Sequence, residues 1–224
     1  DRTDSSHRWG CCCEIDQWDD AAIVAQNPTA DLPSLNITAV HRADDSGTTA
    51  NFTDYLAAAA PSVWTVGSIE KWPLEFGGEA APQTSGVVDA VTNGTGTIGY
   101  ADASRVGELG TVAVKVGDDY VPYSPEAAAA IVDVSPFGEG RGETDFAVDI
   151  DRASTASGVY PVVLISYLIA CNEYASNERV DVLRGYLDYV ISPEGQQAAA
   201  ASAGSAPISA SLYEKARAAV AAIK

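Results

Sequence analysis

One short stretch of the chain gathers side chains that could hold an anion. Arg42 is followed at short intervals by Asp44, Ser46, Gly47 and Thr48. The guanidinium of an arginine is a planar fork of N–H donors that fits a tetrahedral oxyanion. Serine and threonine add hydroxyl donors, and a glycine lets the backbone approach a ligand closely. These residue types at this spacing indicate a site for a tetrahedral oxyanion.

The elements predicted around this stretch would bring its donors together. Residues 36–41 form an apolar run of the kind found in strands. Residues 48–59 carry apolar side chains at helical spacing, which predicts a helix with Ser46 as its cap. The first N–H groups of a helix have no partner within the helix, and the helix dipole adds partial positive charge there. We therefore expect the anion site at the turn between this strand and this helix.

The same stretch also fits an ordinary capped helix that follows a strand. In that interpretation Arg42 forms a salt bridge on the surface, and Ser46 serves the helix alone. Turns of the type Ser-Gly-Thr are common in proteins, and so is arginine. The residues by themselves therefore leave the two interpretations balanced.

The amino-acid sequence of this stretch resembles a family signature. Residues 42–49, Arg-Ala-Asp-Asp-Ser-Gly-Thr-Thr, and the aromatic-rich residues 51–56 resemble the signature of the phosphate-binding protein of phosphate ABC importers. The resemblance implies a contact with phosphate for four residues: Arg42, Ser46, Gly47 and Thr48. It also implies that Asp44 orients Arg42. Asp45 departs from the family, which most often has glycine there, and its carboxylate could either face outward or repel the anion.

The resemblance extends over nearly the whole chain, from Glu14 to Lys224. It implies an α/β, periplasmic-binding-protein-like fold of class II with two lobes, the first of them incomplete. Residues 14–160 would form the second lobe with the phosphate-binding turn, and residues 161–224 would form a hinge strand and C-terminal helices that return to the first lobe. Residues 1–13, with three adjacent cysteines, match nothing in the family, and we interpret them as a tag-like or uncertain segment.

The part of the family's first lobe without a counterpart here includes a carboxylate that accepts a hydrogen bond from protonated phosphate. The resemblance gives this sequence no residue in that role. We therefore expect this chain alone to bind phosphate weakly or not at all. Its N-terminus is polar and shows no signal peptide, so we expect a processed or incompletely given chain.

Further patterns predict the elements of the remaining chain. Asp19 or Asp20 should cap a short helix, and Thr84 to Gly86 either cap the next helix or form a second anion contact. Cys171 is expected to be a buried thiol. The other predicted elements are strands at 97–100, 146–150 and 159–169, a hairpin over 111–122, and helices at 84–91, 125–132, 177–192, 193–203 and 209–224.

Composition excludes several classes of partner. The formal net charge is −18, from 13 basic and 31 acidic residues, whereas nucleic acids and anionic membranes require a basic face. No apolar run is long enough for a transmembrane helix, and no spaced cluster of ligands predicts a metal site. The acidic charge does not exclude phosphate, since short-range donors in a desolvated site outweigh a diffuse field that is screened over about 8 Å.

Catalysis has little support in the sequence. Only two histidines occur, His7 and His41, and a hydrolase built from Ser46, His41 and Asp44 would crowd all three into one turn. The motif Gly-x-Ser-x-Gly, which exposes a nucleophilic serine, does not occur. A phosphoester hydrolase is therefore the weaker alternative, beside a surface or structural module without a role in transport.

The function implied by the resemblance is the binding of inorganic phosphate in a cleft between two lobes and its delivery to a membrane ABC permease. We expect no enzymatic activity, no cofactor and no metal. We also expect a monomer outside the cytoplasm, in the periplasm or at the cell surface. A lipid anchor in the full-length precursor stays open.

Overall fold

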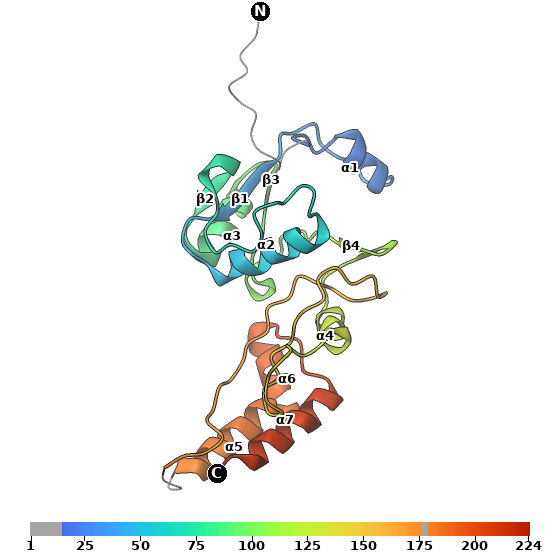
Figure 1. Cartoon of the computed structure of the whole chain (residues 1–224). Coiled ribbons are helices and arrows are strands. Elements are labelled where there is room, and N and C mark those ends of the chain that lie inside the picture. Colours follow the sequence, from blue (N-terminus) through green and yellow to red (C-terminus); the bar gives the residue numbers. More distant parts are fainter. Residues whose placement is uncertain (1–14, 176–178) are drawn as a thin grey trace, which may run out of the picture. The chain divides into compact units, whose positions relative to one another are not determined.

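A computed structural model describes residues 15–175 and 179–224 and divides the chain into two compact units, the first ending at Leu109 and the second running from Gly110 to Lys224 (Figure 1). The predicted tag-like segment 1–13 lies outside the described residues. The predicted division into residues 14–160 and 161–224 refers to the lobes of the longer family fold and stays a prediction.

The first unit is built on a small parallel sheet. Its strands are β1 (Thr38–Arg42), β2 (Glu79–Ala81) and β3 (Thr97–Gly99), in the order β2-β1-β3. Arg42 pairs with Ala81, and Val40 with Gly99. Because all three strands are parallel, their carboxyl ends meet at one edge of the sheet, which is where open α/β sheets bind ligands.

Helices connect these strands. The turn after β1 leads into α2 (Gly47–Ala59), and β2 leads into α3 (Gln83–Asn93) before the chain returns as β3 (Figure 1). Before the sheet lies α1 (Ala21–Gln26), whose first turn is capped by Asp20. Two short 3-10 helices, at Leu74–Phe76 and Ala103–Arg105, complete the unit among the described residues. The predicted strand, capped helix and following strand are thus confirmed, each within one or two residues of its expected bounds.

Side chains alternate between the two faces of the sheet. On one face Val40 packs against Val87 of α3, and a side chain at Gly99 would lie 3.1 Å from Val87, so this position keeps α3 close to the sheet. On the other face the ring of His41 stacks on Trp72, with centroids 5.1 Å apart. Trp72 in turn belongs to an aromatic cluster with Trp64, Phe76 and Tyr100. Both faces of this small sheet are therefore covered.

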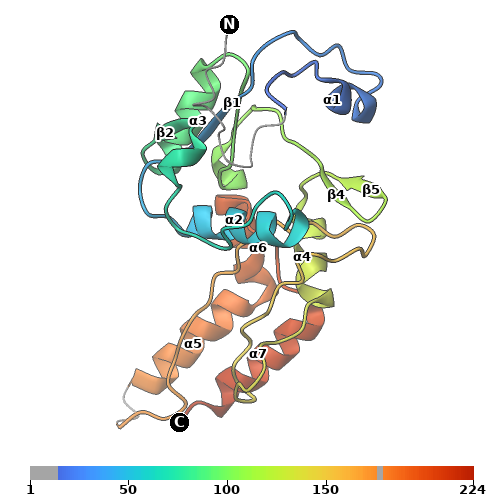
Figure 2. The ribbon, with the colours of Figure 1, turned by 45° about the horizontal axis from the view of Figure 1, so that its top comes forward.

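The second unit begins with a hairpin of β4 (Val114–Val116) and β5 (Asp119–Val121), followed by α4 (Pro125–Val134) (Figure 2). Their core gathers around Ile131, which is fully buried. Three helices follow, α5 (Val180–Ile191), α6 (Pro193–Ala203) and α7 (Ala210–Ala222). A second core packs α5 against α7 and the residue that follows α7. Its buried members are Val180, Leu187, Val220 and Ile223. The hairpin and the helices confirm the prediction, although the expected start of α5 at 177 lies outside the described residues.

The apolar run at 159–169 does not form the predicted buried strand. Val159 is buried, but Leu164, Leu168 and Ile169 are exposed, the last by 96%. A strand buried on both faces needs neighbouring strands, and the described part of the chain pairs none with this run. The strand expected at 146–150 is likewise reduced to a single bridge between Phe137 and Val148.

The prediction that Cys171 is a buried thiol is wrong, because Cys171 is exposed. It lies two residues beyond the exposed end of the apolar run at 159–169. The expectation of burial depended on that run being a core strand, and it fails for the same reason.

A threonine holds the loop before β2 against α2. Thr53 is fully buried, accepts the amide of Ile69 at 3.0 Å and donates to carbonyls, among them that of Thr49 at 2.8 Å. One residue further along the same loop, the carbonyl of Glu70 accepts the amide of Ser46 at 3.0 Å. These bonds tie the start of α2 to the loop that runs beside it.

Replacing Thr53 by valine should therefore lower the free energy of unfolding by about 1–3 kcal/mol, because a buried amide loses its acceptor. Chemical denaturation measures the change. Thr92→Val is the matched control, since Thr92 also donates to a helix carbonyl but is exposed, and it should change stability by less than about 0.5 kcal/mol. Equal effects of the two changes would contradict a special role for Thr53.

Candidate anion-binding site

Arg42 is the last residue of β1, and its side chain is only 12% exposed. Its Nε donates to Oδ1 of Asp44 at 2.9 Å, and its Nη2 donates to Oδ2 of the same carboxylate. Two parallel bonds between a guanidinium and a carboxylate fix the plane of the fork. Nη1 and the second hydrogen of Nη2 are left on the side of the fork that Asp44 does not occupy.

Asp44 is held from two sides. Besides Arg42, its Oδ1 accepts the backbone amide of Gln83 at 2.9 Å. The hydrogen bond from Arg42 is the main cause that lowers the pKa of the Asp44 carboxyl well below its usual range, and the amide of Gln83 adds to it. The same carboxylate raises the pKa of Arg42. The pair is therefore fully ionised at neutral pH, and Asp44 has the geometry of the orienting residue that the resemblance implied.

The start of α3 is the part of this site that the sequence did not predict. Pro82, the residue before α3, has no side chain that can cap it, and Asp44 from the turn after β1 bonds the first helical amide instead. Gln83 has a φ of +58°, a conformation that non-glycine residues seldom adopt. The hydroxyl oxygen of Thr84 lies 3.5 Å from Nη1 of Arg42. The sequence offered Thr84 to Gly86 as a cap or an anion contact, but no pattern pointed to the bond between Asp44 and Gln83.

Ser46 caps α2 as predicted. It is 6% exposed, and its Oγ accepts the amides of Thr48 at 3.1 Å and of Thr49 at 3.4 Å. Because the oxygen accepts both bonds, the hydroxyl hydrogen is left to donate elsewhere. The amides themselves are less available than expected, since that of Ser46 bonds Glu70 and that of Thr48 bonds its own cap.

Gly47 supplies the donor that is left at this helix start. Among the residues that the structure describes, its amide has no hydrogen-bond partner. A methyl group built at Gly47 would meet no atom within 4 Å. Neither the fold nor a positive φ therefore requires glycine at this position. The open space beside the residue is the place where a ligand could approach the backbone.

The structure places the predicted residues in two groups at the carboxyl edge of the sheet. Arg42 and Asp44 form one group with the start of α3, whereas Ser46, Gly47 and Thr48 form the first turn of α2. Asp45, between the groups, is exposed, as expected if its carboxylate faces outward. Donors from two helix starts and one guanidinium thus stand at one end of β1, which suits an oxyanion more than a cation.

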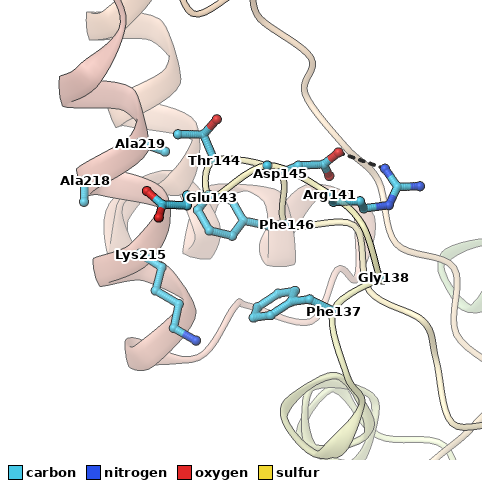
Figure 3. Close-up of a pocket in the computed structure, with 11 residues that line it drawn as sticks. Phe137, Gly138, Arg141, Glu143, Thr144, Asp145, Phe146, Lys215, Ala218 and Ala219 are labelled. Atoms are coloured by element: carbon cyan, nitrogen blue, oxygen red, sulfur yellow. Dashed lines mark hydrogen bonds and ion pairs between the residues drawn. The ribbon is translucent and has the colours of Figure 1, made fainter.

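A hollow of about 530 Å³ lies elsewhere, in the second unit between an acidic loop and α7 (Figure 3). The rings of Phe137 and Phe146 meet edge to face, and Nζ of Lys215 lies 4.9 Å from the centroid of the Phe137 ring. Arg141 is paired with Asp145 at 2.8 Å. Because carboxylates offset the cations in this hollow, it lacks the surplus of donors that binds an oxyanion.

Residues 15–175 and 179–224 lack two other features, a cluster of metal ligands and a helix that could span a membrane. No group of three or more His, Cys, Asp and Glu side chains is placed to hold a metal ion there. None of the helices in this part of the chain combines the length and the apolar character needed to cross a bilayer.

Comparisons with known sequences agree with the predicted family. Residues 13–194 match the PBP superfamily domain. The phosphate-binding protein PstS 2 of Mycobacterium tuberculosis is 31% identical over 216 residues, which is 93% of this chain and 57% of that protein. The phosphate-binding protein PstS of Xylella fastidiosa is 30% identical over 163 residues, which is 70% of this chain and 43% of that protein. The chain spans about half the length of the curated relatives it matches.

Solved structures show the same fold. A high-affinity periplasmic phosphate-binding protein bound with phosphate has a TM-score of 0.58 and 21% identity, and the match covers 91% of this chain and 61% of that one. A phosphate-binding protein from Stenotrophomonas maltophilia has a TM-score of 0.52 and 16% identity, with 91% and 60% covered. These likenesses confirm the expected α/β periplasmic-binding-protein-like fold.

The pairing of Asp44 predicts a pH-dependent contribution to stability. The folded-state pKa of Asp44 is below its usual value of 3.8, so the unfolded chain takes up a proton at Asp44 before the folded chain does. The contribution of the ion pair to stability is therefore complete above about pH 3.8, and it is lost as the pH falls toward the folded-state pKa. Asp44→Asn should therefore be less stable than the unmodified chain at pH 7, and the difference should shrink below about pH 4. Urea denaturation between pH 7 and pH 3 measures it.

Asp45→Asn is the control for this series, because Asp45 is the exposed neighbour. It should change stability little at pH 7. A difference between Asp44→Asn and the unmodified chain that stays constant down to pH 3 would show that the ion pair does not hold Asp44 in its charged form.

Proposed function

The chain belongs to the PBP superfamily, and from this membership we propose that it binds inorganic phosphate at the carboxyl end of β1. The observation that carries the proposal is the fork of Arg42, which Asp44 holds from one side while Nη1 and part of Nη2 face away from that carboxylate. A fork fixed in advance loses little freedom when it binds, so more of its interaction energy appears as affinity.

Two features complement the fork. The amide of Gly47 and the hydroxyl of Ser46 are donors at the start of α2, where the helix dipole favours an anion. In the proposed site, Arg42, Ser46, Gly47 and Thr48 contact phosphate, and Asp44 orients Arg42. The guanidinium charge is balanced by Asp44, so binding would depend on directed hydrogen bonds more than on net charge. This fits a chain whose formal charge is −18.

For the longer protein that its relatives represent, we propose phosphate binding in a cleft between two lobes and delivery to a membrane ABC permease. The relatives named PstS and the solved periplasmic protein support this proposal by their names and their fold. We also propose that the protein acts outside the cytoplasm, as a monomer and without a cofactor. In that scheme the hinge and the return to the first lobe lie in residues 161–224.

Binding is favoured over hydrolysis by the surroundings of His41. His41 is 6% exposed, its ring stacks on Trp72, and its Nδ1 lies 3.0 Å from the carbonyl oxygen of Arg42. The imidazole is thus engaged by its own strand and by an aromatic ring, and among the described residues no hydrogen bond joins it to the Ser46 hydroxyl that a hydrolase would have to activate. A surface module without transport remains the alternative, and it would require no anion affinity at this turn.

A phosphate titration of the 224-residue chain, followed by NMR, tests the proposal. Phosphate should shift the signals of the Gly47 amide and of the Arg42 Nε–H. Arg42→Ala should lower the affinity by about 100-fold or abolish binding, because a charged, bidentate donor is lost. Circular dichroism of each variant monitors the fold.

The matched control is Arg141→Ala. Arg141 is also paired with an aspartate, at 2.8 Å, but it lies in the second unit and is exposed. Its loss should leave the phosphate affinity unchanged. Phosphate-induced shifts that persist in Arg42→Ala, or that fall around Arg141, would overturn the proposed site.

Gly47 separates a binding role from a structural one. Because a methyl group would meet nothing there, Gly47→Ala should keep the stability within about 1 kcal/mol of the unmodified chain. The methyl would occupy the space proposed for phosphate, so the affinity should fall at least about tenfold, a loss of about 1.4 kcal/mol. An unchanged affinity in the same titration would show that the ligand does not approach this amide.

A further inference from the structure

The phenol of Tyr100 connects the two groups of the proposed site. Tyr100 follows β3 directly, and its hydroxyl oxygen accepts the backbone amide of Arg42 at 3.3 Å. The same hydroxyl lies 2.7 Å from Oγ1 of Thr49, in the first turn of α2. One side chain thus contacts the residue that carries the guanidinium and the helix start that carries the other donors.

The sheet explains why a side chain is needed at this place. Amides of successive strand residues point to opposite sides, and the amide of Ala43 bonds Ala81 of β2 at 2.9 Å. The amide of Arg42 therefore points toward the β3 side. There the paired register ends where Val40 meets Gly99, and β3 offers no carbonyl further along. The hydroxyl of Tyr100 takes the place of that missing strand acceptor.

The ring of Tyr100 is fixed by its neighbours. It stacks on Phe52 of α2, with centroids 4.6 Å apart and planes 17° from parallel, and it lies 6.3 Å from the ring of Trp72. Thr49, the other partner of the hydroxyl, is fully buried. Because both partners and the ring are held, the hydroxyl has a defined position between the end of β1 and the first turn of α2.

We propose that Tyr100 is a positioning residue of the phosphate site: its hydroxyl sets the spacing between the guanidinium of Arg42 and the donors at the start of α2. The inference rests on the proposed function. An oxyanion needs donors from both groups at once, and a small displacement of one group removes its bonds from reach. Tyr100 itself does not contact the ligand in this scheme.

Tyr100→Phe tests the inference, since it keeps the stacked ring and removes only the hydroxyl. Hydrogen exchange of the Arg42 amide should accelerate at least tenfold in this variant. Phosphate affinity, measured by the NMR titration, should fall about tenfold. Tyr55→Phe, which removes a hydroxyl from a half-buried tyrosine of α2, is the matched control and should change neither quantity.

A double-mutant cycle separates positioning from a general loss of packing. Thr49→Val removes the second partner of the hydroxyl, and Thr49→Ser keeps it. If the two side chains act as one connection, Tyr100→Phe should weaken binding no further in the Thr49→Val background, and Thr49→Ser should bind like the unmodified chain. Losses that simply add would overturn the inference.

The readouts also separate this inference from the proposed function. An Arg42 amide that exchanges equally fast with and without the hydroxyl would overturn the connection, whatever phosphate does. Faster exchange with an unchanged phosphate affinity would overturn the positioning role and leave the proposed function intact. Because this chain alone is expected to bind phosphate weakly, the titration extends to millimolar phosphate. Absence of any binding there would overturn the proposed function and, with it, the role of Tyr100 in the site.

Discussion

The paired hydrogen bonds between Arg42 and Asp44 are the interaction on which the rest of the proposed site depends. A long arginine side chain would otherwise sample many rotamers at the end of a strand. Asp44 removes that freedom, and the amide of Gln83 fixes Asp44 in turn. The carboxylate therefore serves two elements at once, because it orients the guanidinium and caps α3, whose own preceding residue is a proline.

The local parts of this arrangement could be predicted from the sequence. Ser46 predicts the start of α2, because a serine hydroxyl just before an apolar helical pattern can accept the first amides of the helix. The structure shows that cap. The strand before it, the hairpin at Gly117 and the C-terminal helices were predictable for the same reason, since their signals lie within a few neighbouring residues. The resemblance to phosphate-binding proteins added the role of Asp44, which the spacing of the residues did not establish.

The remaining features depend on contacts between distant segments. The contact of Asp44 with Gln83 joins residues 39 positions apart, and that of Tyr100 with Arg42 joins residues 58 apart, so no local pattern could reveal either. The run at 159–169 failed as a predicted strand because apolar content indicates burial without supplying the neighbouring strands that burial requires. The exposure of Cys171 follows from the same error.

The central claim is that a guanidinium held by Asp44 and the start of α2 together bind a tetrahedral oxyanion. A crystal structure of the chain with arsenate tests it most directly, because arsenic marks the anion by its anomalous scattering. The account predicts an anomalous peak placed so that the oxygens of the arsenate lie within hydrogen-bond distance of both Nη1 of Arg42 and the amide of Gly47. An anomalous peak elsewhere, with no anion beside Arg42 or Gly47, would contradict it.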